Sequence, residues 1–231
     1  MKKTMPKTSS KALSQTPPPR KPAKPAKSKA AKSTELTAPF TRTPHSGGKG
    51  EIRIIGGQWK RSLLPVADVP GLRPTPDRVR ETLFNWLGQD LTGWRCADVF
   101  GGCGALGFEA ASRGAASVLI VENNPALLRP LQTTKERLNA AAVSIERGDG
   151  VAALRRCAPA SLDLVLLDPP FDSALYEPAL QAAASATQAE GHVYLEAPIA
   201  WTDEQLTPLG FKLYRYLKAG VVHSHLLHRM P

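Results

Sequence analysis

The chain has few cysteines and no long apolar segment. Its 231 residues include three cysteines, Cys96, Cys103 and Cys157, and no two of them have the C-x-x-C spacing of a zinc or redox site. This small, odd number excludes a disulfide framework and favours a reduced, cytoplasmic setting. No apolar run approaches the roughly 20 residues that cross a bilayer, and the N-terminus lacks the apolar core of a secretory signal. We therefore expect a cytoplasmic protein with no metal site and no membrane partner.

Acidic residues are almost absent from the first 50 positions. Residues 1–50 carry 12 Lys and Arg against Glu35 (12 − 1 = +11), whereas residues 51–231 carry 18 against 19 acids (18 − 19 = −1). The net charge of +10 therefore belongs to this segment, and the remainder is almost neutral. The segment is rich in Lys, Pro, Ala, Ser and Thr, and has too few apolar residues to fold by burial. We interpret it as a disordered cationic tail, either a solubilising extension or an electrostatic tether to RNA.

The pattern changes at residue 51 to that of one folded domain. With 42% hydrophobic residues, the chain is long enough for one sizeable core. Residues 51–90 predict a small N-terminal unit: two short strands around Gly56 and Gly57, then a helix capped by Thr75. The apolar residues of that helix recur at helical spacing, so one of its faces is expected to be buried.

Strands and helices then alternate over the predicted core, residues 95–231. The expected strands cover 96–100, 117–122, 144–149, 162–168 and 191–198, with helices at 105–113, 124–139, 150–157 and 176–188. A final hairpin turns near Ala219 and Gly220. This alternation predicts an α/β fold with a mostly parallel seven-stranded sheet and a C-terminal antiparallel hairpin. Ligands of such sheets bind at the carboxyl ends of the strands.

A glycine-rich turn follows the first strand of this series. In F-G-G-C-G-A-L-G (100–107), Gly102, Gly104 and Gly107 satisfy G-x-G-x-x-G, and Glu122 ends the next strand 20 residues after Gly102. Glycines let the chain turn tightly and let a cofactor approach the backbone, and the acid can bind both hydroxyls of a ribose. The motif alone does not separate NAD from S-adenosylmethionine, since both carry an adenosyl ribose.

Two further acids favour S-adenosylmethionine. Asp98 lies inside the strand before the turn, where a carboxylate would attract the ammonium of a methionine moiety and repel a pyrophosphate. Asp149 ends the third strand, where it can accept a hydrogen bond from an adenine amino group or a bound water. Each acid alone is typical of a surface or a helix cap, but neighbouring strand ends would bring the two together.

The stretch V-L-L-D-P-P-F-D (165–172) combines a buried strand with an acid, two prolines and an aromatic residue. An exocyclic amine on a base is a poor nucleophile because its lone pair is delocalised into the ring. Two acceptors for its hydrogens would help it react, and the Asp168 carboxylate and the rigidly held Pro169 carbonyl can serve. Phe171 can stack on the base. The pattern therefore predicts methyl transfer to an amine, which an acidic site stabilises as positive charge grows.

Four segments, in this order, resemble one family. They are I-R-I-I-G-G, R-P-T-P-D-R-V-R-E-T-L-F-N-W-L, D-V-F-G-G-C-G-A-L-G-F-E-A-A-S-R-G-A and L-L-D-P-P-F. Together they closely resemble the bacterial 16S ribosomal RNA guanine-N2-methyltransferases of the RsmD type, over about residues 51–231. The resemblance implies a Rossmann-like class I methyltransferase fold, S-adenosylmethionine as cofactor and guanine 966 of 16S RNA as target. It also implies a monomer that meets its RNA in an assembled or assembling 30S subunit.

The resemblance also assigns roles by motif position. The amine-binding turn would be Asp168, Pro169, Pro170 and Phe171. The cofactor would be lined by Thr75, Asn85, Asp98, Phe100, Gly101, Gly102, Gly104, Gly107, Glu122, Asn123 and Asp149. The family's loop usually reads closer to F-A-G-S-G, and this chain differs from it at Gly101 and Cys103. Both replacements are small, so we expect cofactor binding to persist.

Basic residues gather between positions 53 and 80, beside Trp59. The candidates for RNA contact are Arg53, Lys60, Arg61, Arg73, Arg78 and Arg80. Because the folded part is otherwise neutral, this local patch is the best RNA-binding surface that the body offers. A solvated basic face, or a role in positioning the R-P-T helix, is the alternative.

Other interpretations stay open on the residues alone. A DNA or RNA adenine-N6-methyltransferase could use the same D-P-P-F turn, because guanine N2 and adenine N6 are both exocyclic amines. An NAD-dependent oxidoreductase would use the glycine motif, and a non-catalytic RNA-binding module would have kept only the fold. His223, His225 and His228 resemble a metal cluster, but we interpret them as exposed strand residues because no acid or cysteine completes a site.

Overall fold

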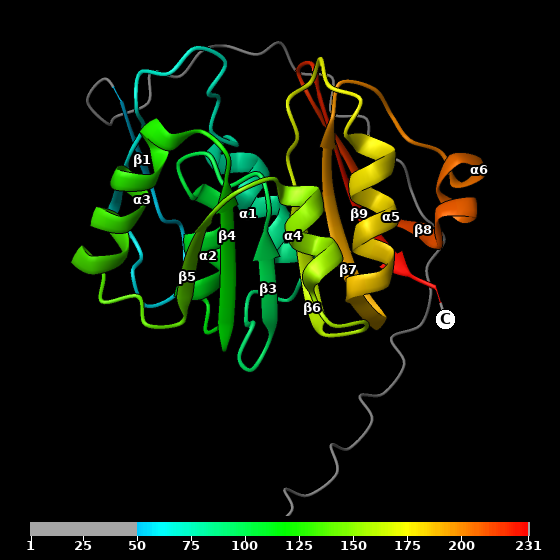
Figure 1. Ribbon diagram of the computed structural model, residues 1–231, viewed down its shortest axis with the longest axis horizontal. Helices are drawn as coiled ribbons and strands as arrows, with labels where there is room; N and C mark the ends of the chain where they lie inside the picture. The colour runs from blue at the N-terminus through cyan, green and yellow to red at the C-terminus, as the bar shows by residue number, and fades with distance from the viewer. Residues whose placement is uncertain (1–49, 231) are drawn as a thin grey trace, which may run out of the picture. The chain divides into compact units, whose positions relative to one another are not determined.

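A seven-stranded sheet organises the residues that the computed structural model describes, 50–230, so the predicted tail lies outside them apart from Gly50. Its strands are β3 (Arg95–Asp98), β4 (Ser117–Glu122), β5 (Val143–Arg147), β6 (Leu162–Leu167), β7 (Thr187–Ala197), β8 (Phe211–Ala219) and β9 (Val222–Arg229). They lie in the order β5-β4-β3-β6-β7-β9-β8 (Figure 1). The first five are parallel, and β9 is antiparallel to both β7 and β8. The predicted sheet and its closing hairpin are confirmed.

The chain changes direction across the sheet between β3 and β6. From β3 it moves outward to β4 and β5, and it then returns to place β6 against the other side of β3. The connections on the two sides therefore leave in opposite directions, and the carboxyl ends of two such strands are where ligands of open α/β sheets bind. β3 ends at Asp98, and β6 ends at Leu167, directly before the D-P-P-F turn.

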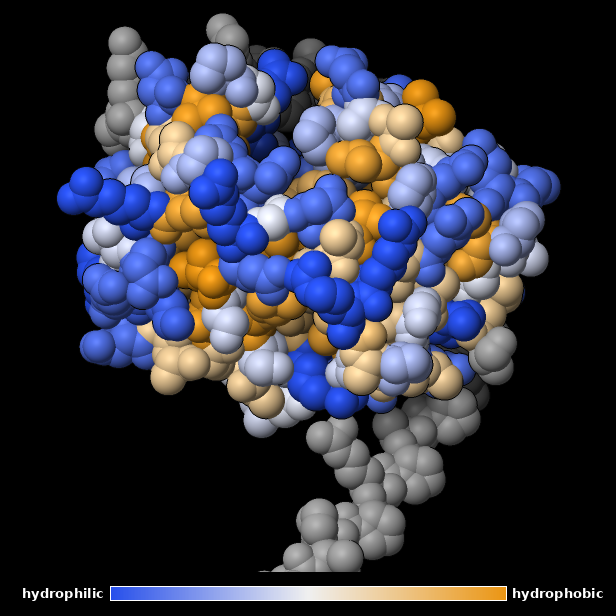
Figure 2. Space-filling model, viewed as in Figure 1, coloured by the Kyte–Doolittle hydropathy of each residue, from blue (hydrophilic) through white to orange (hydrophobic). Residues whose placement is uncertain are grey.

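Helices cover both faces of the sheet. They are α1 (Asp77–Trp86), α2 (Ala105–Ser112), α3 (Pro125–Arg137), α4 (Gly150–Arg156), α5 (Tyr176–Ala186), the short α6 (Asp203–Leu206) and a 3-10 turn at Thr207–Leu209. One core cluster contains residues of α1, α2 and α3, and the other contains residues of α4, α5 and α6. In Figure 2, hydrophilic and hydrophobic residues intermix on the side of α4 and α5. Covering helices explain why β6 reads as an almost continuous apolar run.

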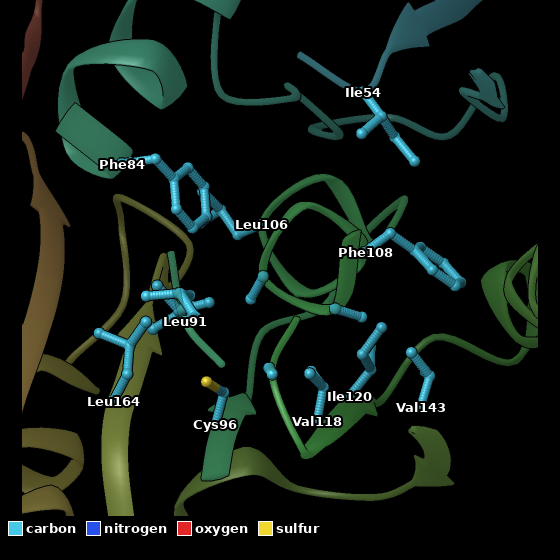
Figure 3. Close-up of a cluster of buried hydrophobic side chains, with 14 of the residues drawn as sticks. Ile54, Phe84, Leu91, Cys96, Leu106, Phe108, Val118, Ile120, Val143 and Leu164 are labelled. Carbon is cyan, nitrogen blue, oxygen red and sulfur yellow. The ribbon is translucent and has the colours of Figure 1, made fainter. Parts of the chain in front are cut away.

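The N-terminal segment joins the first core cluster. β1 (Glu51–Arg53) and β2 (Leu63–Pro65) form a two-stranded antiparallel sheet. Figure 3 shows Ile54 of this segment and Phe84 of α1 on either side of α2, above the side chains of the central strands. Because both side chains are fully buried, the segment is part of the hydrophobic core.

The predicted pair of short strands around Gly56 and Gly57 is confirmed, but the two glycines do more than connect the strands. The connection between β1 and β2 runs from residue 54 to 62, and its glycines lie against α2. Gly57 has a φ of 73°, and a Cβ there would lie 1.9 Å from the carbonyl oxygen of Ser112. The next residue, Gln58, donates its N–H to that same oxygen at 2.7 Å. These glycines therefore also serve close packing against a helix.

A buried ionic group fastens this segment to α2. The carboxylate of Glu109, which is fully buried, accepts from the N–H groups of Ile55 and Gly56 at 2.7 and 2.8 Å. It also accepts from Nη1 of Arg80 at 3.3 Å and from Nε of Arg113 at 2.9 Å. One acid thus neutralises parts of two arginines and satisfies two backbone donors.

Arg80 is therefore a correction to the predicted RNA surface. Its side chain has no exposed area, and its remaining donors reach the carbonyls of Thr75 and Arg53 and the carboxylate of Asp77. An arginine with a fully hydrogen-bonded, buried guanidinium cannot contact a phosphate without breaking this network. The alternative role, positioning the helix that follows R-P-T, is the one that the structure supports for it.

Two element boundaries also differ from expectation. α1 begins at Asp77 after Pro76, and no side chain caps it, so Thr75 is not its N-cap. β7 begins at Thr187, directly after α5, because Thr187 pairs with Leu162 before an irregularity in the β6–β7 register. That pairing extends β7 over residues that the sequence assigned to the helix and the following loop.

Candidate functional site

Three acids meet at the carboxyl edge of the sheet. Asp98 ends β3, Asp168 follows β6, and Glu196 lies near the end of β7, which are three neighbouring strands. Leu166 pairs with Asp98 on one side and with Tyr194 on the other. Since side chains alternate along a strand, Asp168 and Glu196 project to the same face as Leu166 and Tyr194, the face covered by α1 and α2.

These carboxyl groups raise one another's pKa. Burial raises the pKa of Asp98 to about 7, opposed by a hydrogen bond from Gly107 and assisted by Glu122 and Glu196. Burial, then the charges of Glu196 and Asp98, raises the pKa of Asp168 well above its usual value. Burial also raises the pKa of Glu196. Buried like charges disfavour ionisation, so this edge is suited to a ligand that brings positive charge.

The glycine loop follows β3 and is bound to Asp98, one of these acids. Gly102 and Gly104 have φ values of 53° and 80°, which a residue with a Cβ rarely adopts. The N–H of Gly107 donates to the Asp98 carboxylate at 2.8 Å, and a Cβ there would lie 2.8 Å from Ile120. The loop is therefore closed by glycines and tied to the end of β3, which confirms the predicted strand–turn–helix context of the motif.

Glu122 holds the loop from the neighbouring strand. Its two carboxylate oxygens accept from the N–H of Gly102 at 2.7 Å and from the N–H of Asn124 at 2.6 Å. The exposed Asn123 lies between the strand and helix α3, for which Asn124 is the N-cap. Glu122, which the sequence predicts to bind a ribose, therefore lies beside the glycine loop. Its own hydrogen bonds also stabilise the loop.

Asp149, the last predicted cofactor acid, caps a helix as well. Its Oδ1 accepts from the N–H of Ala152 at 2.7 Å, at the start of α4. Asp149 is exposed just after the end of β5, which lies two strands away from β3 in the sheet. Phe100 and Gly101, also predicted here, begin the loop, and Phe100 packs against the second core cluster. The structure brings this set to one edge of the sheet.

The D-P-P-F turn is held by its own hydrogen bonds. The carbonyl of Pro170 accepts from both the N–H and the hydroxyl of Ser173, at 3.0 and 2.6 Å. Pro169 is buried, whereas Phe171 is half-buried and belongs to neither core cluster. Phe171 thus retains surface for a ligand, and the alternative that it serves only as a core residue is not supported.

Two site residues were missed by the sequence reasoning. Glu196 accepts from the Thr75 hydroxyl and from the Tyr194 hydroxyl, both at 2.8 Å. Tyr176, at the start of α5, has a buried hydroxyl with no hydrogen-bond partner among residues 50–230. Burial, then the charges of Asp168 and Asp172, raises the Tyr176 pKa to about 12. The position of Glu196 at the carboxyl end of the fifth predicted strand was a usable signal for it; Tyr176 had none.

Four of the remaining predicted residues, three of them cationic, line a separate basic groove. It has a volume of about 530 Å³ between the N-terminal segment and α1, and its lining includes Arg53, Lys60, Arg61, Asp77 and Asn85. Asn85, which was expected near the cofactor, therefore faces the basic groove and not the strand-end acids. Its amide oxygen accepts from Gln89 at 2.8 Å. The exposed RNA candidates are Arg53, Lys60, Arg61, Arg73 and Arg78.

The C-terminal histidines have structural environments. His225 is fully buried, and its Nε2 accepts from the N–H of Trp201 at 3.0 Å, so it is not the exposed residue that was expected. His228 packs on the rings of His192 and Tyr214, with centroids 4.5 and 4.3 Å away. Within residues 50–230, no three His, Cys, Asp or Glu side chains are grouped to hold a metal ion. In the same range, no helix has the length and apolarity to cross a membrane.

Comparisons with known proteins agree with this geometry. The family model described as Conserved hypothetical protein 95 matches residues 52–228. Ribosomal RNA small subunit methyltransferase D of Escherichia coli K12 is 37% identical over 81% of this chain and 95% of its own, and its Haemophilus influenzae namesake is 34% identical over 80% and 96%.

Solved structures extend the likeness to three dimensions. The Escherichia coli protein yhhF is 34% identical, with a TM-score of 0.68 over 78% of this chain and 99% of its own. A precorrin-6y C5,15-methyltransferase from Geobacter metallireducens, 17% identical with a TM-score of 0.57, covers 71% of this chain and 94% of its own and shares the fold alone. The predicted Rossmann-like methyltransferase fold is thereby confirmed. Because these relatives are matched over nearly their whole length at 34–37% identity, this chain belongs to the ribosomal RNA small subunit methyltransferase D family.

Proposed function

We propose that this protein transfers a methyl group from S-adenosylmethionine to the exocyclic N2 amine of a guanine in 16S ribosomal RNA. The observation that carries the proposal is the juxtaposition of the D-P-P-F turn, the glycine loop and a buried acidic edge at one switch point of the sheet. The names of the relatives supply the RNA. The family resemblance supplies guanine 966, a 30S particle as the setting and a monomer as the working form.

The residues at this edge fit S-adenosylmethionine. When bound, this cofactor supplies a methyl group on a positively charged sulfonium. Gly102 and Gly104 allow a ligand close to the backbone, and Glu122 and Asp149 lie at strand ends where ribose and adenine would be held. Asp98, with its raised pKa, would face the ammonium of the methionine part. A dinucleotide would instead bring a pyrophosphate to a buried carboxylate, which is unfavourable.

The turn after β6 would hold and activate the amine. The Asp168 carboxylate and the Pro169 carbonyl accept its two hydrogens, and Phe171 stacks on the base. An amine that had received the methyl group would carry positive charge beside Asp168. Asp168 then takes the surplus proton, a role for which its raised pKa makes it a better base. The buried acids stabilise that developing charge more than the neutral amine.

The basic groove would bring the RNA to this edge. Arg53, Lys60 and Arg61 are exposed at the groove, and Arg73 and Arg78 are exposed on either side of the buried Thr75 in the sequence. Contacts of this kind neutralise phosphates and fix orientation, but they do not select a base. Binding should therefore weaken steeply with added salt.

Labelled S-adenosylmethionine tests the proposal. It would be offered with naked 16S RNA, with small subunits that lack the mark, and with DNA, followed by nucleoside analysis. We expect label in N2-methylguanosine, with the assembled subunit as the better substrate. Label confined to N6-methyladenosine would replace the proposal with the adenine alternative. No transfer to any of the three by a folded protein that binds S-adenosylmethionine would leave a non-catalytic RNA-binding module.

A further inference from the structure

Glu196 is a buried acid at the proposed transfer site to which no role has been given. Its residue is 3% exposed, and one oxygen, Oε1, accepts from two hydroxyls at 2.8 Å. The first donor is Thr75, which lies 121 positions earlier in the chain. The second is Tyr194, whose hydroxyl also lies 3.2 Å from Oγ of Ser224 on β9. An acid that accepts from two hydroxyls, one of them from a distant segment of the chain, fixes the geometry at this strand end.

Thr75 is held from two sides. Its hydroxyl is bound by Glu196, and its carbonyl accepts from Nε of the buried Arg80 at 3.1 Å. Arg80 in turn belongs to the ionic group around Glu109. Residues 73–76 are thus fastened between the core under α2 and the carboxyl edge of the sheet. Without the Glu196 bond, only the core side of this fastening would remain.

Glu196 also lies beside the acceptor of the D-P-P-F turn. Continuing the β6–β7 register, in which Leu166 pairs with Tyr194, places Asp168 opposite Glu196, on the same face of the sheet. The ionisable groups that face Glu196 are Asp168 and Asp98 from neighbouring strands, Tyr194 from its own strand and Arg80 from α1. Two functions therefore converge on one carboxylate, the anchoring of a segment and the charge next to Asp168.

We propose, resting on the function proposed above, that Glu196 is a positioning residue of the transfer site: its carboxylate anchors Thr75 over the strand edge and keeps Asp168 basic enough to accept the amine's proton. Glu196 does not touch the substrate in this scheme. It acts through two other residues, and each action can be removed separately by substitution.

The charge is removed by Glu196→Gln, which keeps an oxygen to accept from Thr75 and Tyr194. Asp168 works as a carboxylate, so kcat/KM rises with pH as Asp168 loses its proton. Burial, and then the Glu196 charge, holds the Asp168 pKa up. Removing that charge lowers the Asp168 pKa, so the acid limb of the kcat/KM profile should move to lower pH, by about one unit. Glu204→Gln, the same change at an exposed acid of α6, is the matched control.

The anchor is removed by Thr75→Val, which keeps the charge and the shape. We expect KM for S-adenosylmethionine to rise by about fivefold, the effect of one hydrogen bond, with the acid limb unmoved. Thr75→Ser, which keeps the hydroxyl, should restore the wild-type KM. Thermal melts would establish that each variant is folded before its kinetics are compared.

The proposal requires different effects from the two variants: a shifted pH profile for Glu196→Gln and a raised KM for Thr75→Val. A folded Glu196→Gln protein with the wild-type pH profile would overturn the electrostatic role, and a Thr75→Val protein with the wild-type KM would overturn the anchoring role. Failure of the proposed function itself is distinguishable, because the wild-type protein would then transfer no methyl group to RNA in the same assay.

Discussion

Glu109 and the three strand-end acids lie on the same side of the sheet, and they differ in what neutralises their charge. Glu109 of α2 has ion pairs to both Arg80 and Arg113. The strand-end acids Asp98, Asp168 and Glu196 take part in none of the ion pairs among residues 50–230. A buried charge that has its partner stabilises a structure, and one without a partner is suited to a ligand that supplies it. The presence or absence of an ion pair thus distinguishes Glu109 from the three strand-end acids.

Substitution of the paired acid should have the largest effect. Glu109→Ala leaves two arginines and two backbone N–H groups without their acceptor in the core. Removing one partner of a buried ionic group costs about 3–5 kcal/mol of the free energy of unfolding. Urea denaturation would measure this loss. A change of less than about 1 kcal/mol would mean that water reaches the site and that the group is not a structural core.

Substitution of an acid without an ion pair should have the opposite effect: activity should fall, and stability should not. Asp168→Asn keeps an amide oxygen that can accept a hydrogen bond but removes the base and the negative charge of the proposed reaction, so methyl transfer should fall by about 100-fold or more. The same change removes a half-buried charge that has no ion-pair partner among residues 50–230, so the free energy of unfolding should stay the same or rise. Single-turnover methylation and urea denaturation would be measured on the same preparation. If Asp168→Asn lowered the free energy of unfolding, Asp168 would have a structural role like that of Glu109.

The pH dependence of stability should distinguish the groups next. The folded pKa of Asp98, about 7, lies above the unfolded value of 3.8. The folded state therefore binds the extra proton, and the contribution of Asp98 to stability is present at low pH and lost as the pH rises through about 7. Asp98→Asn, whose amide oxygen still accepts from Gly107, should lose less stability between pH 5 and pH 8 than the wild type. Parallel stability–pH curves for the two proteins would contradict this.

Tyr176 should give the smallest effect. Its buried hydroxyl has no partner among the described residues, so Tyr176→Phe should leave the free energy of unfolding within about 0.5 kcal/mol of the wild type. If that hydroxyl meets the RNA, KM for the RNA substrate should rise by a few fold. Initial rates at varied RNA concentration would show this. A loss of stability with an unchanged KM would make Tyr176 a packing residue.

The features that could be predicted from the sequence are those that depend on residues close together in the chain. The alternation of strands and helices, the glycine turn and the D-P-P-F turn each result from residues close together in the chain. The strand end at which Glu196 lies could be seen in the sequence, but the hydrogen bonds of Arg80 and Glu196 have partners 29 and 121 positions away, respectively, so no local pattern indicated these bonds. For the same reason, Arg80 was grouped with exposed arginines beside it in the sequence, and Thr75 was assigned to the helix that it precedes rather than to a distant strand.

The bond between Thr75 and Glu196 also has a consequence for biosynthesis. Its two residues lie 121 positions apart, so the anchor of residues 73–76 cannot form until β7 has left the ribosome. Contacts of such long range form late, because the loop between the residues must be closed first. Domains fold from the N-terminus as synthesis proceeds. A nascent or truncated chain that stops before β7 therefore presents the glycine loop and the D-P-P-F turn while Thr75 lacks its anchor, so the proposed positioning role of Glu196 begins only once β7 is in place.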